Sequence, residues 1–455
     1  MRHAIKLALD RQIDHFKKSF HQLEGLVFND FLPISLLNNI IDHTPHVRAS
    51  VYTPLVTLNA FIHQVLSDDS SCKRAVAGVL VDRLQAGETA NCINTGPYCN
   101  ARARLPLNQL VEASTSVGLS LHKNADSAWK WKKFNVVIVD GTTVSMPDTP
   151  ANQEAFPQQS NQKAGLGFPI ARLVAMISLA AGTVMGYDIA PYQGKGTGEL
   201  SLIYKLLDNL AVNDLLLGDR YYCTYAIIAL LQARGIPVLF QMHANKTADF
   251  NSGISLGAKD HKIDWIKPKR KPVWMTDQEY SVLPQQITVR EFAVKGVQYV
   301  TTLDDHNTYS KQELAELYIE RWNVEVDIRS IKTSMGMDIL NCKSPDMVRK
   351  EIAVHILAYN IIRGNMVQAA YLNKIKPRNL SFRSAVQIVT QATKQFLTLA
   401  EEVLAKASLA ILKAIASTPI KLKKRISQTR AIKRRPKSFP LLTVPRKEAC
   451  LSIVY

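Results

Sequence analysis

A series of short apolar segments in the middle of the chain most limits the folds that it can adopt. The runs 136–139 and 214–218 are typical of buried strands, and residues 171–189 predict a hairpin that turns at 180–183. A last strand is predicted at 237–241. Between these strands lie two segments with helical spacing, 199–210 and 225–234. The resulting β-β-β-α-β-α-β order predicts a mixed α/β sheet.

An aspartate follows each of two predicted strands. Asp140 comes directly after the first run and precedes Gly-Thr, which predicts a turn, and Asp219 follows the second run. In an open α/β sheet, neighbouring strand ends form the crevice where ligands bind. Two carboxylates brought together there repel each other unless a cation lies between them, and a divalent metal commonly fills that role. The alternative is that each aspartate only caps a turn or a helix.

A predicted helix between residues 318 and 332 collects further polar groups. At about 100° per residue, one face carries four of them: Tyr318, Arg321, Glu325 and Lys332. Glu320 and Asp327 fall on the opposite side of this helix. Carboxylates that bind metal and cations that bind phosphate suit phosphodiester chemistry. A solvated, salt-bridged helix face is the competing interpretation of the same pattern.

The charge of the whole chain favours a polyanionic partner. The sequence has 56 Lys and Arg against 38 Asp and Glu, a formal net charge of +18. Nucleic acid is the default partner of so basic a protein. An anionic membrane surface is the weaker alternative, because the basic residues are not confined to one amphipathic helix. The longest apolar run, 173–187, is too short to span a bilayer, and we expect a cytoplasmic protein.

Taken together, three sequence blocks resemble the catalytic blocks of DDE transposases. They are Val139-Asp140-Gly-Thr-Thr, Gly218-Asp219-Arg-Tyr-Tyr and the Tyr-x2-Arg-x3-Glu-x6-Lys pattern that begins at Tyr318. The pattern matches the bacterial insertion-sequence-four family in particular. The resemblance covers roughly residues 90–370 and is most specific in the last block.

The resemblance implies a fold, an activity and partners. The implied fold is an RNase H-like catalytic domain with an inserted β subdomain between Asp219 and Glu325, flanked by helical regions. The implied reaction is Mg²⁺-dependent cutting at terminal inverted repeats and joining of the 3′ ends to target DNA, with Mn²⁺ as a substitute metal. The implied partners are double-stranded DNA, both the terminal repeats and the target, and a second copy of the chain in the DNA complex. Such a protein would act at the bacterial nucleoid.

The family's functional residues can be carried over to matching positions. Asp140, Asp219 and Glu325 would be the metal ligands. Tyr318, Arg321 and Lys332 would hold DNA phosphates near the cut. Some family members stack a flipped base on an aromatic residue of the insertion. Tyr299 is the candidate here, although a Trp is expected at that place and an ordinary half-buried strand Tyr explains it equally well.

The expected domain organisation has five parts. They are a helical DNA-binding region (1–125), the first part of the catalytic domain (126–242), a β-strand insertion (243–303), the second part of the catalytic domain (304–376) and a helical C-terminal region with a basic tail (377–455).

Two segments outside the catalytic blocks are candidates for DNA contacts. Arg102 and Arg104 lie on a short predicted helix after a Gly-Pro turn, where arginines can reach base edges or phosphates. A surface helix that packs on the catalytic domain is the alternative. The tail from Lys421 to Lys437 has nine cations and no aromatic residue, which suits phosphate contacts rather than base recognition.

Three functions remain compatible with these patterns. The first is an active transposase, and the second is a metal-dependent nuclease on the same fold. The third is a non-catalytic DNA-binding protein derived from a transposase. The presence of all three acids argues against the third, because a protein without catalysis has no need of them.

Overall fold

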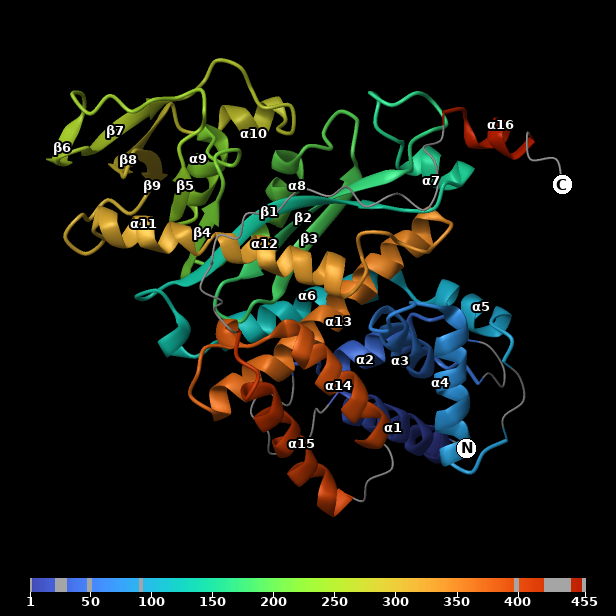
Figure 1. Ribbon diagram of the computed structural model, residues 1–455. Coiled ribbons are helices and arrows are strands. Elements are labelled where there is room, and N and C mark those ends of the chain that lie inside the picture. Colours follow the sequence, from blue (N-terminus) through green and yellow to red (C-terminus); the bar gives the residue numbers. More distant parts are fainter. Residues whose placement is uncertain are drawn as a thin grey trace, which may run out of the picture.

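A nine-stranded mixed sheet runs through the part of the chain that the structure describes (Figure 1). The computed structural model describes residues 2–20, 31–46, 51–89, 93–396, 401–420 and 443–451. The strand order is β3-β2-β1-β4-β5-β9-β8-β7-β6. The strands are β1 (Asn135–Ser145), β2 (Ile170–Ser178), β3 (Val184–Pro191), β4 (Asp214–Gly218), β5 (Val238–Gln241), β6 (Ile254–Gly257), β7 (Asp260–Ile266), β8 (Gln286–Val294) and β9 (Val297–Thr301).

The first five strands form the predicted mixed sheet. β1 pairs antiparallel with β2 and parallel with β4, and β4 pairs parallel with β5. β2 and β3 form the predicted hairpin. Three antiparallel strands followed by two parallel ones confirm the expected mixed α/β, RNase H-like arrangement.

The insertion between β5 and the later helices continues this sheet. β9 pairs antiparallel with β5, and β8, β7 and β6 follow outward in antiparallel order. The short helix α10 (Asp277–Ser281) begins with a capping box and lies between β7 and β8 in the sequence. The inserted strands therefore share one sheet with β1–β5 rather than forming a separate sheet.

Helices precede and follow the sheet in the sequence. The N-terminal helices are α1 (Arg2–Ser19), α2 (Ile34–Asp42), α3 (Pro54–Val65), α4 (Cys72–Gln85), α5 (Gly96–Arg104) and α6 (Leu107–Lys123). Those among the first strands are α7 (Pro150–Ala155), α8 (Glu199–Leu206) and α9 (Tyr225–Ala233). The later helices are α11 (Lys311–Ile319), α12 (Trp322–Arg329), the π-helical turn η3 (Ser330–Ser334), α13 (Pro345–Leu372), α14 (Phe382–Phe396), α15 (Glu401–Ala416) and α16 (Arg446–Leu451).

Each face of the sheet has its own hydrophobic core. Side chains alternate between the two faces of a strand. Accordingly, Val136 and Ile138 belong to a cluster that includes residues of α6, α12 and α13. Val137 and Val139 belong to a second cluster with residues of α8 and α9. The N-terminal helices lie beyond α6 and α13 (Figure 1).

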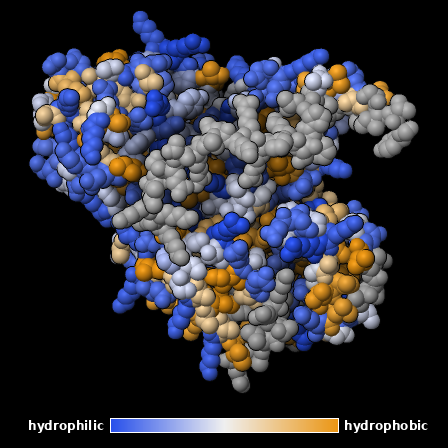
Figure 2. All heavy atoms as spheres, in the orientation of Figure 1, coloured by the Kyte–Doolittle hydropathy of each residue, from blue (hydrophilic) through white to orange (hydrophobic). Residues whose placement is uncertain are grey.

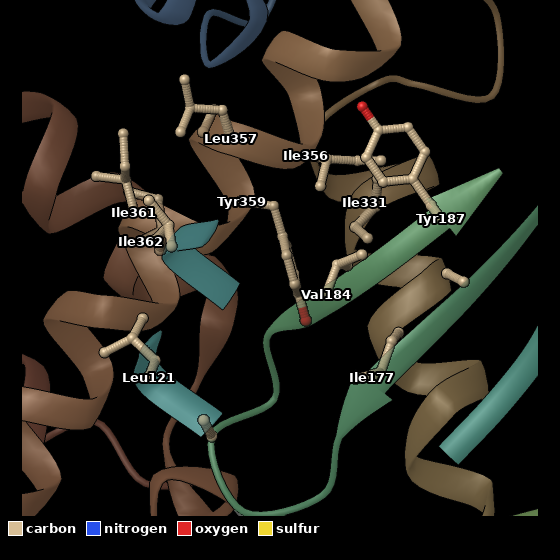
Figure 3. Packing of buried hydrophobic residues seen from close by; sticks show 14 of the residues in the cluster. Leu121, Ile177, Val184, Tyr187, Ile331, Ile356, Leu357, Tyr359, Ile361 and Ile362 are labelled. Atoms are coloured by element: carbon tan, nitrogen blue, oxygen red, sulfur yellow. The ribbon is translucent and has the colours of Figure 1, made fainter. Parts of the chain in front are cut away.

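The helices α6 and α13 approach the β2–β3 hairpin closely. At Gly118 of α6, an added Cβ would lie 1.8 Å from the carbonyl oxygen of Val184, so only glycine fits there. Tyr359 of α13 points toward the hairpin (Figure 3), and its hydroxyl donates a hydrogen bond to the Gly182 carbonyl at 2.7 Å. These contacts fix α6 and α13 against the β2–β3 hairpin of the sheet.

The visible surface is mostly hydrophilic in the view of Figure 2. Hydrophobic side chains gather over α4, where Val81 and Leu84 are about half exposed. In the residues that the structure describes, no helix is both long enough and apolar enough to cross a membrane. The basic tail 421–437 lies outside the described residues.

Candidate active site

Asp140 and Asp219 lie side by side at one edge of the β1–β4 pair. The last paired residues of these parallel strands are Ile138 and Leu217, and each aspartate follows two positions later. That spacing returns both side chains to the face that carries Val136 and Ile138. β1 itself does not end at Asp140. It continues to Ser145 because β2 pairs with it along its whole length, so the predicted turn at Gly141-Thr is wrong.

The environment of Asp140 disfavours its ionised form. Burial is the main cause and raises the pKa of its carboxyl group to about 6. The backbone N–H of Gly141 and the Arg321 guanidinium act in the opposite direction, and the negative charges of Asp219 and Glu199 raise the pKa further. Asp140 is thus a carboxylate that a nearby cation would stabilise.

The expected continuous helix 318–332 is interrupted. α11 begins with a capping box between Ser310 and Glu313 and ends at Ile319. Glu320 and Arg321 form a tight turn before α12, and the chain then widens into η3, which carries Lys332. The prediction of one uniform helix is therefore wrong, because Glu320 and Arg321 both donate backbone hydrogen bonds to the residue three positions earlier.

Arg321 lies between two of the predicted acids. Its guanidinium donates a hydrogen bond to Glu325 at 2.9 Å, and its Nη1 is 3.7 Å from Asp140 Oδ2. A positive group thus occupies the space between a strand carboxylate and a helix carboxylate. Over the described residues, no three His, Cys, Asp or Glu side chains come close enough to hold one metal ion.

A cleft of about 450 Å³ opens between β1 and the α12–η3 segment. Its lining residues are mostly polar: Asp140, Gly141, Thr142, Glu325, Ile328, Arg329, Lys332, Thr333 and Asp338. Lys332 donates hydrogen bonds to the Thr143 carbonyl at 2.7 Å and to the Thr142 hydroxyl at 3.2 Å. Acids and cations therefore meet on one concave surface.

Glu199 is a site residue that the sequence patterns did not reveal. It is the first residue of α8, and its charge acts on Asp140. The hydroxyl of Tyr222, three residues after Asp219, donates a hydrogen bond to Glu199 Oε2 at 3.1 Å. A glycine inside a strand signals the close approach of another group. Gly141, inside β1 and not in a turn, is the sequence signal for this approach.

Asp327 lies on the far side of α12, as expected, but it is fully buried. Its carboxylate accepts a hydrogen bond from Arg363 of α13, and the Tyr359 hydroxyl of the same helix lies 3.0 Å from it. Arg378 donates to its other oxygen at 2.6 Å. Asp327 thus anchors α12 to α13, whereas Glu320 is exposed.

Tyr299 does not face solvent, contrary to the role considered for it. It is 6% exposed on β9 and packs between two other rings. The Phe292 ring is stacked on it and the Tyr318 ring meets it edge-on, each with ring centroids 5.1 Å apart. In this conformation Tyr299 is more deeply buried than the half-buried strand tyrosine considered as the alternative, and its ring is not open to a flipped base. Tyr318 is half-buried by the same contact.

The expected DNA contact of Arg102 also needs correction. Arg102 is 7% exposed, donates a hydrogen bond to Gln64 at 3.1 Å and lies over the rings of Phe61 and Tyr98. It joins α5 to α3 and is covered by both. Arg104, two residues later, is only partly buried.

Comparisons of the sequence with known proteins identify the family of this chain. The family model of the transposase DDE domain matches residues 131–361, just over half of the chain. The transposase InsG for insertion sequence element IS4 of Escherichia coli (strain K12) is 26% identical over 296 residues. That alignment covers 64% of this chain and 65% of the relative, so it leaves about a third of each outside. A cryo-EM structure of the piggyBac transposase synaptic complex with hairpin DNA aligns with 88% of this chain and 85% of its own, at 10% identity and a TM-score of 0.45. The match to more than half of its residues shows that this chain belongs to the family of transposase DDE domains.

Proposed function

We propose that this protein is a DNA transposase. It would cut at the terminal inverted repeats of an insertion sequence and join the 3′ ends to target DNA by metal-dependent phosphoryl transfer. The observation that carries the proposal is that Asp140 of β1 lines one cleft with Glu325 of α12, and Arg321 lies between them. Asp219 lies near enough to Asp140 for its charge to act on that carboxyl group.

The donor set fits a divalent cation such as Mg²⁺, with Mn²⁺ as a substitute. Carboxylate oxygens are the ligands that Mg²⁺ prefers, and Asp140 and Asp219 lie close enough for their charges to repel. In this structure the Arg321 guanidinium supplies the positive charge between Asp140 and Glu325 that a metal ion would otherwise supply. When bound, the metal would supply activation of the attacking oxygen and stabilisation of the leaving oxygen.

The cationic residues would position DNA. Arg321, Arg329 and Lys332 border the cleft, where guanidinium and ammonium groups can bind phosphate oxygens. Lys332 is held by Thr142 and Thr143, so its charge is already directed at the end of β1. Tyr318 would support Arg321, since the guanidinium lies 6.0 Å from its ring centroid.

The remaining parts would serve recognition and assembly. We assign end recognition to the helical region 1–125, with Arg104 as a contact, and the strand-forming insertion to residues 243–303. The catalytic domain would comprise 126–242 and 304–376, and the C-terminal region 377–455 would add non-specific affinity for DNA. Two copies would act together on the paired ends of the element, at the nucleoid.

A plasmid assay tests this proposal. The DNA on either side of the gene is sequenced, and the inverted repeats found there are cloned into a supercoiled plasmid. The purified protein should release the segment between the repeats and insert it into a second plasmid, only when Mg²⁺ is present. Nicking without insertion would favour a nuclease on the same fold. Binding without any cleavage would favour a non-catalytic DNA-binding protein.

A further inference from the structure

Two cysteine side chains from different helices meet in the N-terminal helical region. Cys72 is the first residue of α4, and Cys99 lies within α5, 27 positions later in the sequence. Their sulfur atoms are 3.8 Å apart, and both residues are free thiols that are only partly buried. A small oxidant in solution can therefore reach this pair, whereas Cys223 and Cys342 are buried.

A buried guanidinium lies against the same pair. Arg102 is 7% exposed, and its Nη2 donates a hydrogen bond to Cys99 Sγ at 3.9 Å. In the part of the chain that the structure describes, Arg102 forms no ion pair within 4.0 Å, and its Nε has no hydrogen-bond partner. The buried Glu351 carboxylate acts on it only from a greater distance. A positive charge held next to a cysteine favours the reactive thiolate form, so Arg102 favours the thiolate of Cys99.

Cys72 has a different environment from Cys99. The side-chain amide of Gln64 donates a hydrogen bond to Cys72 Sγ at 3.7 Å, and its oxygen accepts one from Arg102 at 3.1 Å. Burial raises the pKa of the Cys72 thiol, and the Arg102 charge offsets this effect only in part. The pair thus consists of one sulfur in contact with a guanidinium and a neighbouring sulfur that retains its proton.

We propose that Cys72 and Cys99 are a peroxide-sensitive thiol pair that closes to a disulfide between α4 and α5. The side chains already touch, so only a small movement brings the two sulfur atoms to bonding distance. The disulfide would link two helices of the N-terminal region covalently, and a thiol reductant would open it again. The proposal goes beyond the transposase function and does not depend on it.

The oxidation takes two steps, with hydrogen peroxide as the oxidant. The Cys99 thiolate attacks one peroxide oxygen and the O–O bond breaks. The leaving hydroxide takes up a proton, and Cys99 becomes a sulfenic acid. The Cys72 sulfur then attacks the Cys99 sulfur, the S–O bond breaks, and the hydroxyl group leaves as water with the proton of Cys72. Two thiols thereby lose two electrons, and one peroxide is reduced to two waters.

Peptide mapping of the oxidised protein tests the proposal. The reduced full-length protein is treated with a small excess of hydrogen peroxide, remaining thiols are blocked with N-ethylmaleimide, and the digest is analysed by mass spectrometry. The peptides that contain Cys72 and Cys99 should be joined with the loss of two hydrogens, and dithiothreitol should separate them. Cys92 lies outside the described residues. Cys92→Ser is the matched control and should give the same linked product.

Two further variants test the order of the steps. Cys72→Ser removes the second thiol, so oxidation should stop at the sulfenic acid of Cys99, which dimedone traps as an adduct. Cys99→Ser should leave Cys72 without an adduct at the peroxide concentration that oxidises the unsubstituted protein. Circular dichroism and thermal unfolding check that each variant is folded.

The outcomes that would overturn the proposal are specific. Peroxide treatment that leaves Cys72 and Cys99 open to N-ethylmaleimide would show that the pair does not react. A disulfide that joins either residue to Cys92 would show that the contact between α4 and α5 is not the reactive one. A dimedone adduct on Cys72 in folded Cys99→Ser would refute the assigned first step. None of these results bears on DNA cleavage, so the proposed function stands or falls separately.

Discussion

Arg321 and Glu325 are joined by a hydrogen bond of 2.9 Å across one turn of the chain, and the same guanidinium lies 3.7 Å from Asp140. Arg321 therefore neutralises two carboxylates that we assign to a metal. A divalent cation that binds Glu325 has to compete with this pair. Once released, the guanidinium would be free to bind a DNA phosphate.

This competition between Arg321 and the metal predicts how Arg321→Gln changes metal and DNA binding. Without the guanidinium, the carboxylates should bind Mn²⁺ more tightly in the absence of DNA, on the order of 10-fold, because one nearby positive charge has been removed. Binding of cleaved-end DNA should weaken in the same variant. Calorimetry with Mn²⁺ and a fluorescence anisotropy titration with DNA measure the two effects. Unchanged or weaker Mn²⁺ binding would show that Arg321 does not compete with the metal.

Substitution of Asp327 should destabilise the protein. Its buried carboxylate lies between Arg363 and Arg378, so Asp327→Asn leaves one buried and one partly buried guanidinium group without their negative partner. The expected loss is roughly 3–5 kcal/mol, which should appear as a fall of several degrees in the apparent Tm. Glu320→Gln, at the exposed turn, is the matched control, and an equal Tm for both variants would contradict the prediction.

Substitution of Asp140 should stabilise the metal-free protein near neutral pH. Its folded-state pKa of about 6 exceeds the ordinary value of 3.8, so ionisation of this carboxyl group opposes folding as pH rises between the two values. Asp140→Asn removes that cost, which is at most about 3 kcal/mol. Thermal unfolding in a metal chelator should therefore show a higher Tm for the variant at about pH 7.5 and no gain below about pH 4. A rise in the Tm of Asp140→Asn that is largest at low pH would contradict this prediction.

The two arginines of α5 should respond differently to substitution. Arg102→Met should lower the Tm, because the guanidinium is buried against Phe61 and Tyr98 and bonded to Gln64. Arg104→Met should leave the Tm unchanged and weaken binding to terminal-repeat DNA by about 1 kcal/mol or more. The pair is compared by thermal unfolding and by anisotropy titration. If Arg104→Met binds the repeat normally, end recognition does not use α5.

Local sequence patterns were sufficient to predict much of the catalytic sheet. The strand ending at Gly218, the helix that begins at Tyr225 and the β2–β3 hairpin all depend on short-range apolar periodicity, which the sequence displays directly. The extension of β1 past Asp140 could not be predicted in this way. Gly141 and Thr142 are typical of a turn, but pairing with β2, more than thirty residues later, keeps them in the strand.

Features that depend on distant contacts were missed. Glu320 and Arg321 form a turn although both residue types favour helices, so the local sequence does not predict this turn. Glu199 and Gly141 are far apart in sequence, and only folding brings them together. Arg102 shares a short basic helix with Arg104, and only the packing of α3 on α5 distinguishes the buried arginine from the partly buried one.

The most direct test of the whole account is Mg²⁺-dependent cleavage by variants of the three family acids. Asp140→Asn, Asp219→Asn and Glu325→Gln are each compared with Glu320→Gln on a plasmid that carries the terminal repeats, and DNA binding is measured in parallel. We predict that the first three variants bind the repeats but cut less than one-thousandth as fast, on the order of the loss expected when a metal ligand is removed. Glu320→Gln should cut at the normal rate. Normal cleavage by a folded Glu325→Gln protein would contradict the account, because Glu325 would then not belong to the metal site.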